Sequence, residues 1–236
     1  MKTLSYSIPL IRLTTWFCWL IVINANNSVF GAEQTQSGDV LKVQDWEFVV
    51  APYGLLASID GDSTVGRLGS QPLQVDAGTI LDNLETAVMV HAEARKGPWG
   101  IMLDLIYVEM DLKGSSPRGG FAKADVDELV LESMFSYRVN QSRNSLDFYV
   151  GVRYWDLDLD FALTGPGGVG SIASGGGDRW VDPVVGVRKI QYLSDRWFLI
   201  GRADIGGFHV GSDLSWQVEV GGGYEFSDRF ALSLQY

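Results

Sequence analysis

Alternation of apolar and polar side chains along residues 99–111 constrains the fold more than any other feature of the sequence. Every second position from 99 to 107 is apolar: Trp99, Ile101, Leu103, Leu105 and Tyr107. Because successive side chains of a β-strand point to opposite faces, these residues form one apolar face of a strand. In the same phase Glu109 and Asp111 follow, so the apolar face begins and ends at an aromatic residue.

A second segment, residues 146–160, repeats this pattern. Its alternate apolar positions are Leu146, Phe148, Val150, Val152 and Tyr154, and its next positions in phase are Asp156, Asp158 and Asp160. A lipid-facing barrel strand is apolar outside and polar inside over roughly 9–11 residues, with aromatic residues at the membrane interfaces. The two equal apolar spans favour a transmembrane β-barrel over a soluble sandwich.

Composition excludes several other classes. The 46% of hydrophobic residues rules out a disordered chain, and the formal net charge of -11 argues against nucleic acid as a partner. A mean hydropathy of +0.07 is too low for a bundle of membrane helices. Cys18 is the single cysteine, so the sequence predicts no disulfide and no thiolate metal site.

The N-terminus has the pattern of an export signal. Lys2 and Arg12 precede an apolar run at 16–23, and small residues follow near Gly31. The alternative, a single anchor helix, is disfavoured because this run is shorter than the roughly 18–20 apolar residues that span a bilayer. The sequence therefore predicts a signal peptide over 1–31, a short N-terminal linker over 32–45 and a barrel over 46–236.

The rest of the chain predicts nine antiparallel strands in an all-β, up-and-down order. They are expected near 46–58, 84–96, 99–112, 125–139, 145–163, 179–192, 197–208, 214–226 and 230–236. Short turns alternate with longer links, as in outer-membrane barrels, whose periplasmic turns are short and whose extracellular loops are long. In the first long link, residues 76–85 have apolar residues at helical spacing and predict one short helical turn.

Three segments carry a resemblance to a known group. They read LETAVMVHAEARKGPWGIMLDLIYVEMDL, LDFYVGVRYWDLDLDF and LSDRWFLIGRADIGGFHVGSDLSWQVEVGGGYEFSDRFALSLQY. Over about residues 46–236 the chain resembles the small outer-membrane β-barrel proteins of Gram-negative bacteria, the OmpA-like and porin-like group. The alternation of Phe230, Leu232, Leu234 and Tyr236 is similar to the terminal signal of that group, which the outer-membrane assembly machinery recognises. The resemblance implies outer-membrane localisation, with membrane lipid and lipopolysaccharide as partners.

The strand phase opposite to the apolar faces is rich in charges of both signs. We expect the following residues to form a charge network in the lumen: Glu93, Arg95, Asp104, Glu128, Glu132, Arg138, Arg153, Asp182, Arg188, Arg202, Asp204, Glu219 and Glu225. A barrel of about eight to ten strands is little wider than its own side chains, so opposed charges are expected to pair and fill it. The alternative is a narrow pore, which the excess of acids would make cation-preferring.

Aromatic residues at the ends of the apolar faces predict a girdle at the membrane interfaces. Its expected members are Trp99, Tyr107, Tyr154, Trp197, Phe230 and Tyr236. A short internal repeat supports two of these positions. Ser194–Trp197 and Ser227–Phe230 each consist of a polar turn followed at once by an aromatic residue.

The function expected from the sequence is an envelope structural or interaction role without catalysis. His91 and His209 are the only histidines, and each is interpreted as a polar filler rather than a general base, since His91 lies in the inward strand phase and His209 in a glycine-rich loop. No catalytic residue, cofactor or metal ligand is predicted. Three alternatives stay open: a narrow cation-preferring porin, an outer-membrane barrel enzyme such as a lipase, acyltransferase or protease, and a soluble lipocalin-like binding barrel. The sequence does not indicate an oligomeric state.

The predicted strand number is odd, whereas single-chain bacterial barrels have an even number. Either the sequence is a truncated form of a ten-stranded barrel, or 46–58, which contains Pro52, is not a barrel strand and eight strands close. The first interpretation predicts unpaired edges on the first and the ninth strand.

Overall fold

A computed structural model describes residues 12–24, 46–64, 70–75, 77–115, 121–140, 142–164 and 171–236 of the chain. The predicted linker at 32–45 lies outside the described residues.

The described residues form eleven strands and one six-residue helix. In chain order they are β1 (Arg12–Asn24), β2 (Glu47–Thr64), β3 (Ser70–Val75), α1 (Ala77–Asp82), β4 (Leu84–Lys96), β5 (Trp99–Ser115), β6 (Phe121–Arg138), β7 (Ser145–Thr164), β8 (Ser171–Tyr192), β9 (Trp197–Gly206), β10 (Ser215–Ser227) and β11 (Phe230–Gln235). The prediction of an all-β fold is confirmed, and α1 falls within the segment for which the sequence predicted a helical turn.

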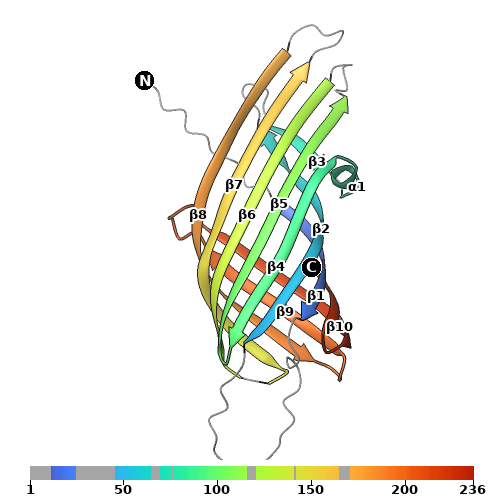
Figure 1. Ribbon diagram of the computed structural model, residues 1–236. Helices are drawn as coiled ribbons and strands as arrows, with labels where there is room; N and C mark the ends of the chain where they lie inside the picture. The colour runs from blue at the N-terminus through green and yellow to red at the C-terminus, as the bar shows by residue number, and fades with distance from the viewer. Residues whose placement is uncertain are drawn as a thin grey trace, which may run out of the picture.

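Nine of these strands, β2 and β4 to β11, form a curled sheet in antiparallel, up-and-down order (Figure 1). They correspond one by one to the nine strands predicted from the sequence. The alternative in which 46–58 is not a barrel strand is wrong. This segment forms β2, which pairs with β4 from Glu47 opposite Arg95 to Pro52 opposite Val90. The short β3 pairs only with the far end of β2.

The first strand connects the two ends of this curled sheet. Positions 18–23 of β1 pair with β11, and the other edge of β1 pairs with β2, both in antiparallel direction. These residues fall inside the segment predicted as a signal peptide. The first and the ninth strand of the up-and-down order are therefore bridged by β1 rather than joined to each other.

The strands differ in length in a way that gives the sheet a tall wall. Strands β5, β6, β7 and β8 have 17, 18, 20 and 22 residues, whereas β9 has 10. Figure 1 shows these four strands rising well beyond β9 and β10. The tall ends carry the longer links, and the opposite ends carry the short turns at 97–98, 139–144, 193–196 and 228–229.

Side chains on the two faces of the curled sheet have opposite character. On β5, Leu103 is 49% exposed on the outer face and its neighbour Met102 is 5% exposed on the inner face. The same two-residue period holds on β7, where Val150 is exposed and Tyr149 is buried. The inner face is the part of the molecule in which the charged residues gather.

Candidate functional site: the charged inner face

All thirteen residues predicted for the lumen are buried or half-buried, and each lies in the inner phase of its strand. They come from β4, β5, β6, β7, β8, β9 and β10, so the curled sheet brings together charges that are far apart in the sequence. Most of them fall into two networks, which we call the Asp147 cluster and the Glu132 cluster.

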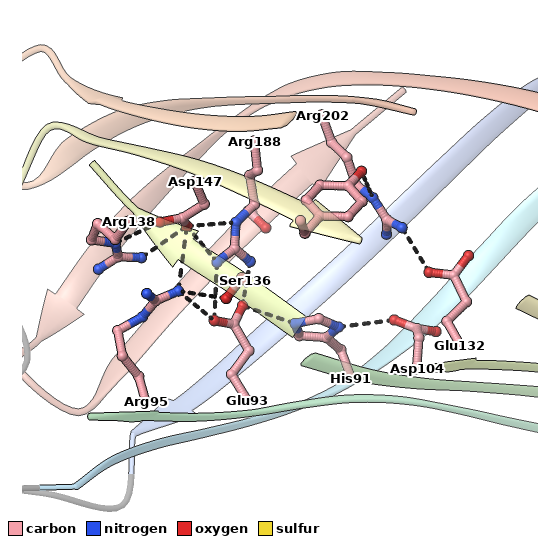
Figure 2. Close-up of polar contacts among 12 residues, drawn as sticks. His91, Glu93, Arg95, Asp104, Glu132, Ser136, Arg138, Asp147, Arg188 and Arg202 are labelled. Carbon is pink, nitrogen blue, oxygen red and sulfur yellow. Dashed lines mark hydrogen bonds and ion pairs between the residues drawn. The ribbon is translucent and has the colours of Figure 1, made fainter. Parts of the chain in front are cut away.

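The Asp147 cluster consists of Glu93, Arg95, Arg138, Asp147 and Arg188 (Figure 2). The Asp147 carboxylate, fully buried, accepts two hydrogen bonds from Arg138, at 2.7 and 3.0 Å. Arg188 donates to Asp147 at 2.9 Å and also binds Glu93, while Arg95 lies 3.5 Å from Asp147. Three guanidinium groups therefore surround one carboxylate, and each positive charge faces a negative one.

A line of hydrogen bonds extends this cluster along the inner face. His91 contacts Glu93 through Nε2 and Asp104 through Nδ1, both at 2.9 Å, as Figure 2 shows. The hydroxyl of Tyr53 donates to the other oxygen of Asp104. His91 therefore links two carboxylates from β4 and β5, an arrangement that suits a structural imidazole in an ion-pair network.

The Glu132 cluster consists of Glu132, Tyr149, Arg153, Arg202 and Asp204. Glu132 accepts hydrogen bonds from Arg153 at 2.5 Å and from Arg202 at 2.6 Å. Asp204 lies 3.2 Å from Arg153 and 3.3 Å from Arg202. The Tyr149 hydroxyl donates to Asp204 at 3.0 Å and accepts from Arg202 Nε at 2.8 Å. Two arginines and two carboxylates thus alternate in a closed arrangement.

A glycine on the neighbouring strand makes room for Tyr149. A Cβ atom at Gly186 would lie 2.4 Å from the Tyr149 ring and 2.6 Å from Asp204, which is too close for any side chain. The absence of a side chain at Gly186 therefore lets the tyrosine ring lie close to β8 and reach Asp204 and Arg202.

Apolar side chains pack beside the charged residues of the inner face. Met102, Met134, Tyr149 and Val184 pack together and are at most 5% exposed. The cavity between them and the surrounding charges measures about 20 Å³. Since a water needs roughly 10–15 Å³ of such space, this cavity has room for about one water.

A smaller network lies near the short turns. Arg143 binds Glu225 at 2.8 Å and places its guanidinium 4.1 Å from the centre of the Tyr192 ring. The Tyr192 hydroxyl also binds Glu225. This network joins the turn after β6 to β8 and β10.

Asp104 joins the Asp147 cluster through His91, and three further predicted lumen residues lie outside both clusters and outside this smaller network. Asp182 accepts hydrogen bonds from the backbone N–H and the hydroxyl of Ser212, at 2.7 and 2.8 Å, and so holds the loop between β9 and β10. Glu219 binds Gln217, which in turn accepts from Arg153. Glu128 lies between Val108 and Leu157 in the strand register and makes no hydrogen bond or ion pair with the part of the chain that the structure describes.

The predicted girdle residues lie in different places. Trp99 stacks on Phe135 at 5.2 Å, Trp197 packs edge-on against Tyr224 at 4.9 Å, and these pairs sit beside the short turns with Phe230. Tyr107 and Tyr154 lie farther up the outer face, where their hydroxyls donate to Glu109 and Asp156. Tyr236 follows β11 and bonds through its backbone to Val220 in the middle of β10, away from the aromatic group at the short turns.

Above Tyr107 and Tyr154 the outer face becomes acidic. Register places Asp111 opposite Asp125, and Asp125 opposite Asp160. Lys113 lies 2.6 Å from Asp111, and a hydrogen bond from Lys113 lowers the pKa of that carboxyl below its usual value. Charge of this density marks the part of the outer wall that requires water.

Sequence reasoning missed Asp147, the most heavily paired carboxylate of the inner face. It lies in the inner phase of its strand, two positions before Tyr149, and that phase is the signal that identifies it. His91 and Tyr149 share the same signal. Phase alone predicts that such a residue points inward, but the number of its partners depends on the curvature of the whole sheet.

The Glu132 cluster supports a first prediction. We expect Arg153→Ala and Glu132→Ala each to lower the free energy of unfolding by about 3–5 kcal/mol, because each leaves a buried charge without its partner. The double variant should lose clearly less than the two single losses combined, since the charges are removed together. Urea titrations of refolded protein measure these values.

Arg196→Ala, in an exposed turn, is the control and should change stability by less than about 0.5 kcal/mol. If the loss in the double variant equalled the sum of the two single losses, the pairing of Arg153 with Glu132 would be contradicted.

Comparison with known proteins finds no matching family model and no significantly similar curated protein. Within the described segments, no helix is long and apolar enough to cross a membrane.

Proposed function

We propose that the protein is an outer-membrane β-barrel protein of a Gram-negative envelope, with a structural or interaction role and an ion-paired lumen. The observation that carries this proposal is the inverted distribution of side chains. Outside, Leu103 and Val150 are 49% and 57% exposed; inside, Asp147 and Arg153 are 0% and 4% exposed. Water-soluble proteins have the opposite distribution, because charged residues are rarely buried and large apolar patches are rarely exposed.

The outer apolar residues form a continuous band across neighbouring strands. Leu103 on β5, Phe135 on β6, Val150 on β7, Val185 on β8, Ile205 on β9 and Val218 on β10 all belong to it and are exposed. Aromatic residues border this band near the short turns, and carboxylates border it on the tall wall. A lipid bilayer satisfies such a band, with the aromatic residues at one interface and the carboxylates in water beyond the other.

The short turns then face the periplasm and the tall wall of β5 to β8 projects outside the cell. This orientation follows the asymmetry of outer-membrane barrels. The resemblance to the OmpA-like and porin-like group agrees with it, and its implied partners are membrane lipid, lipopolysaccharide and the assembly machinery.

The geometry favours a filled lumen over a pore. Among the described side chains, the two clusters pair their charges across the inner face, and a cavity lined by residues of both clusters has room for about one water. A soluble binding barrel is disfavoured as well, because its inner face would be apolar and its outer face polar. His91 contacts Asp104 and Glu93 rather than a serine, which supports an ion-pairing role over that of a general base.

Cell fractionation tests this proposal. We expect the protein in the outer-membrane fraction, and we expect its gel mobility to change on heating, because a folded barrel resists detergent until it is heated. Recovery of the protein from the soluble periplasm, with one mobility at all temperatures, would contradict membrane insertion. Planar-bilayer recordings of the same material should show no stable conductance steps, whereas cation-selective steps would favour the porin alternative.

A further inference from the structure

The two edges joined by β1 run in the same direction. β1 pairs antiparallel with β11 on one side and antiparallel with β2 on the other. The same follows from the order of the sheet, since the first and the last of nine alternating strands point the same way. Direct contact between β2 and β11 would therefore be a parallel pair, in a sheet whose other pairings are all antiparallel.

The space between these edges has the width of one strand. With β1 in place, β2 and β11 lie two strand spacings apart, roughly 9–10 Å. The occupant has to run from the tall wall toward the short turns, because only that direction is antiparallel to both neighbours. Such an occupant pairs through its backbone with positions 49–60 of β2 and with positions 230–235 of β11 at the same time.

We infer that β2 and β11 form an acceptor slot for one antiparallel strand, and that in the unprocessed chain the occupant is its own N-terminal segment, Arg12–Asn24. This segment covers two edges whose free N–H and C=O groups would otherwise pair with other chains. Cleavage of the signal peptide that the sequence predicts over 1–31 would remove this segment and leave the slot empty. The inference depends on the strand pairing alone and not on the membrane, so it stands or falls separately from the proposed function.

The single cysteine of the chain provides a sharp test. Position 18 lies opposite position 235 on one side and opposite position 55 on the other. Directly opposite positions of an antiparallel pair share a face and are close enough for a disulfide, whereas a shift of one residue turns the side chain to the other face. Gln235→Cys is therefore the reporter and Leu234→Cys, opposite position 19, is its matched control.

The experiment uses the full chain of 236 residues, produced without export so that residues 1–31 remain. After refolding in detergent and mild oxidation, mass spectrometry of digested protein measures the disulfide to Cys18. We expect the Gln235→Cys chain to give at least about tenfold more of this disulfide than the Leu234→Cys chain, because register fixes the face. Leu55→Cys and Gly54→Cys form the corresponding pair on β2. Equal yields within a pair, or no disulfide in chains that are folded by circular dichroism, would overturn the inference.

A second arrangement covers variants that fold poorly. Leu20 lies opposite both Ser233 and Tyr53, so Leu20→Pro should expel the segment from the slot. In a Gln235→Cys chain that also carries Leu20→Pro and Cys18→Ser, a synthetic peptide of residues 12–24 should form the disulfide in trans, and a scrambled peptide should not. Equal reaction of the two peptides would contradict a strand-specific slot.

Discussion

Asp147→Ala should destabilise the protein more than any other single change on the inner face. Its carboxylate is fully buried and lies within 3.5 Å of Arg138, Arg188 and Arg95. Removing it leaves three guanidinium groups close together with Glu93 as the remaining carboxylate of the cluster. We expect a loss toward the upper end of the roughly 3–5 kcal/mol found when one partner of a buried ion pair is removed.

Urea unfolding of protein refolded in lipid or detergent measures this loss. Asp195→Ala is the matched control, because Asp195 is exposed in the turn between β8 and β9 and should change stability by less than about 0.5 kcal/mol. If Asp147→Ala and Asp195→Ala had similar effects, the inner face would be open to water and the ion pairs would not fill the lumen.

Leu103→Arg should also have a large effect, and only when the protein is inserted in a bilayer. Leu103 is 49% exposed near the middle of the outer apolar band. An arginine on the lipid face costs about 2–4 kcal/mol at the bilayer midplane and about 0–1 kcal/mol near the interfaces.

Glu109→Arg provides the matched control for Leu103→Arg. Glu109 lies on the same strand and face, beyond Tyr107, where the outer face has become acidic. Refolding into phospholipid bilayers with urea as the denaturant compares the two variants. Equal costs at positions 103 and 109 would show that the apolar band does not face hydrocarbon.

The sequence predicted the strands well because alternation records the two faces of a sheet directly. The ends of the tall strands were harder. β8 begins at Ser171 rather than near 179, because Gly175, Gly176 and Gly177 carry no side chains that could reveal a period. β3 was missed since it is short and contains Pro72, and β1 was missed because a continuous apolar run has no alternation.

The residues of the inner face could be predicted, but their partners could not. Arg188 binds Glu93 from a position 95 residues away, and strands β4 and β8 are not neighbours in the sheet. Such a contact depends on the curvature of the whole sheet, which no local pattern encodes. The strand phase places Asp182 and Arg188 on the same inner face but does not distinguish their partners. Asp182 binds the loop between β9 and β10, whereas Arg188 belongs to the Asp147 cluster.

Lipid contact of the outer face is the claim on which the proposed function depends, and quenching by brominated lipid measures it directly. Single cysteines at positions 101 to 105, in a chain carrying Cys18→Ser, would each bear a fluorescent label in vesicles with brominated acyl chains. Positions 101, 103 and 105 should be strongly quenched and positions 102 and 104 weakly, because successive positions of β5 point to opposite faces of the sheet. Uniformly weak quenching, or strong quenching at 102 and 104 instead, would contradict a barrel with its apolar face in lipid.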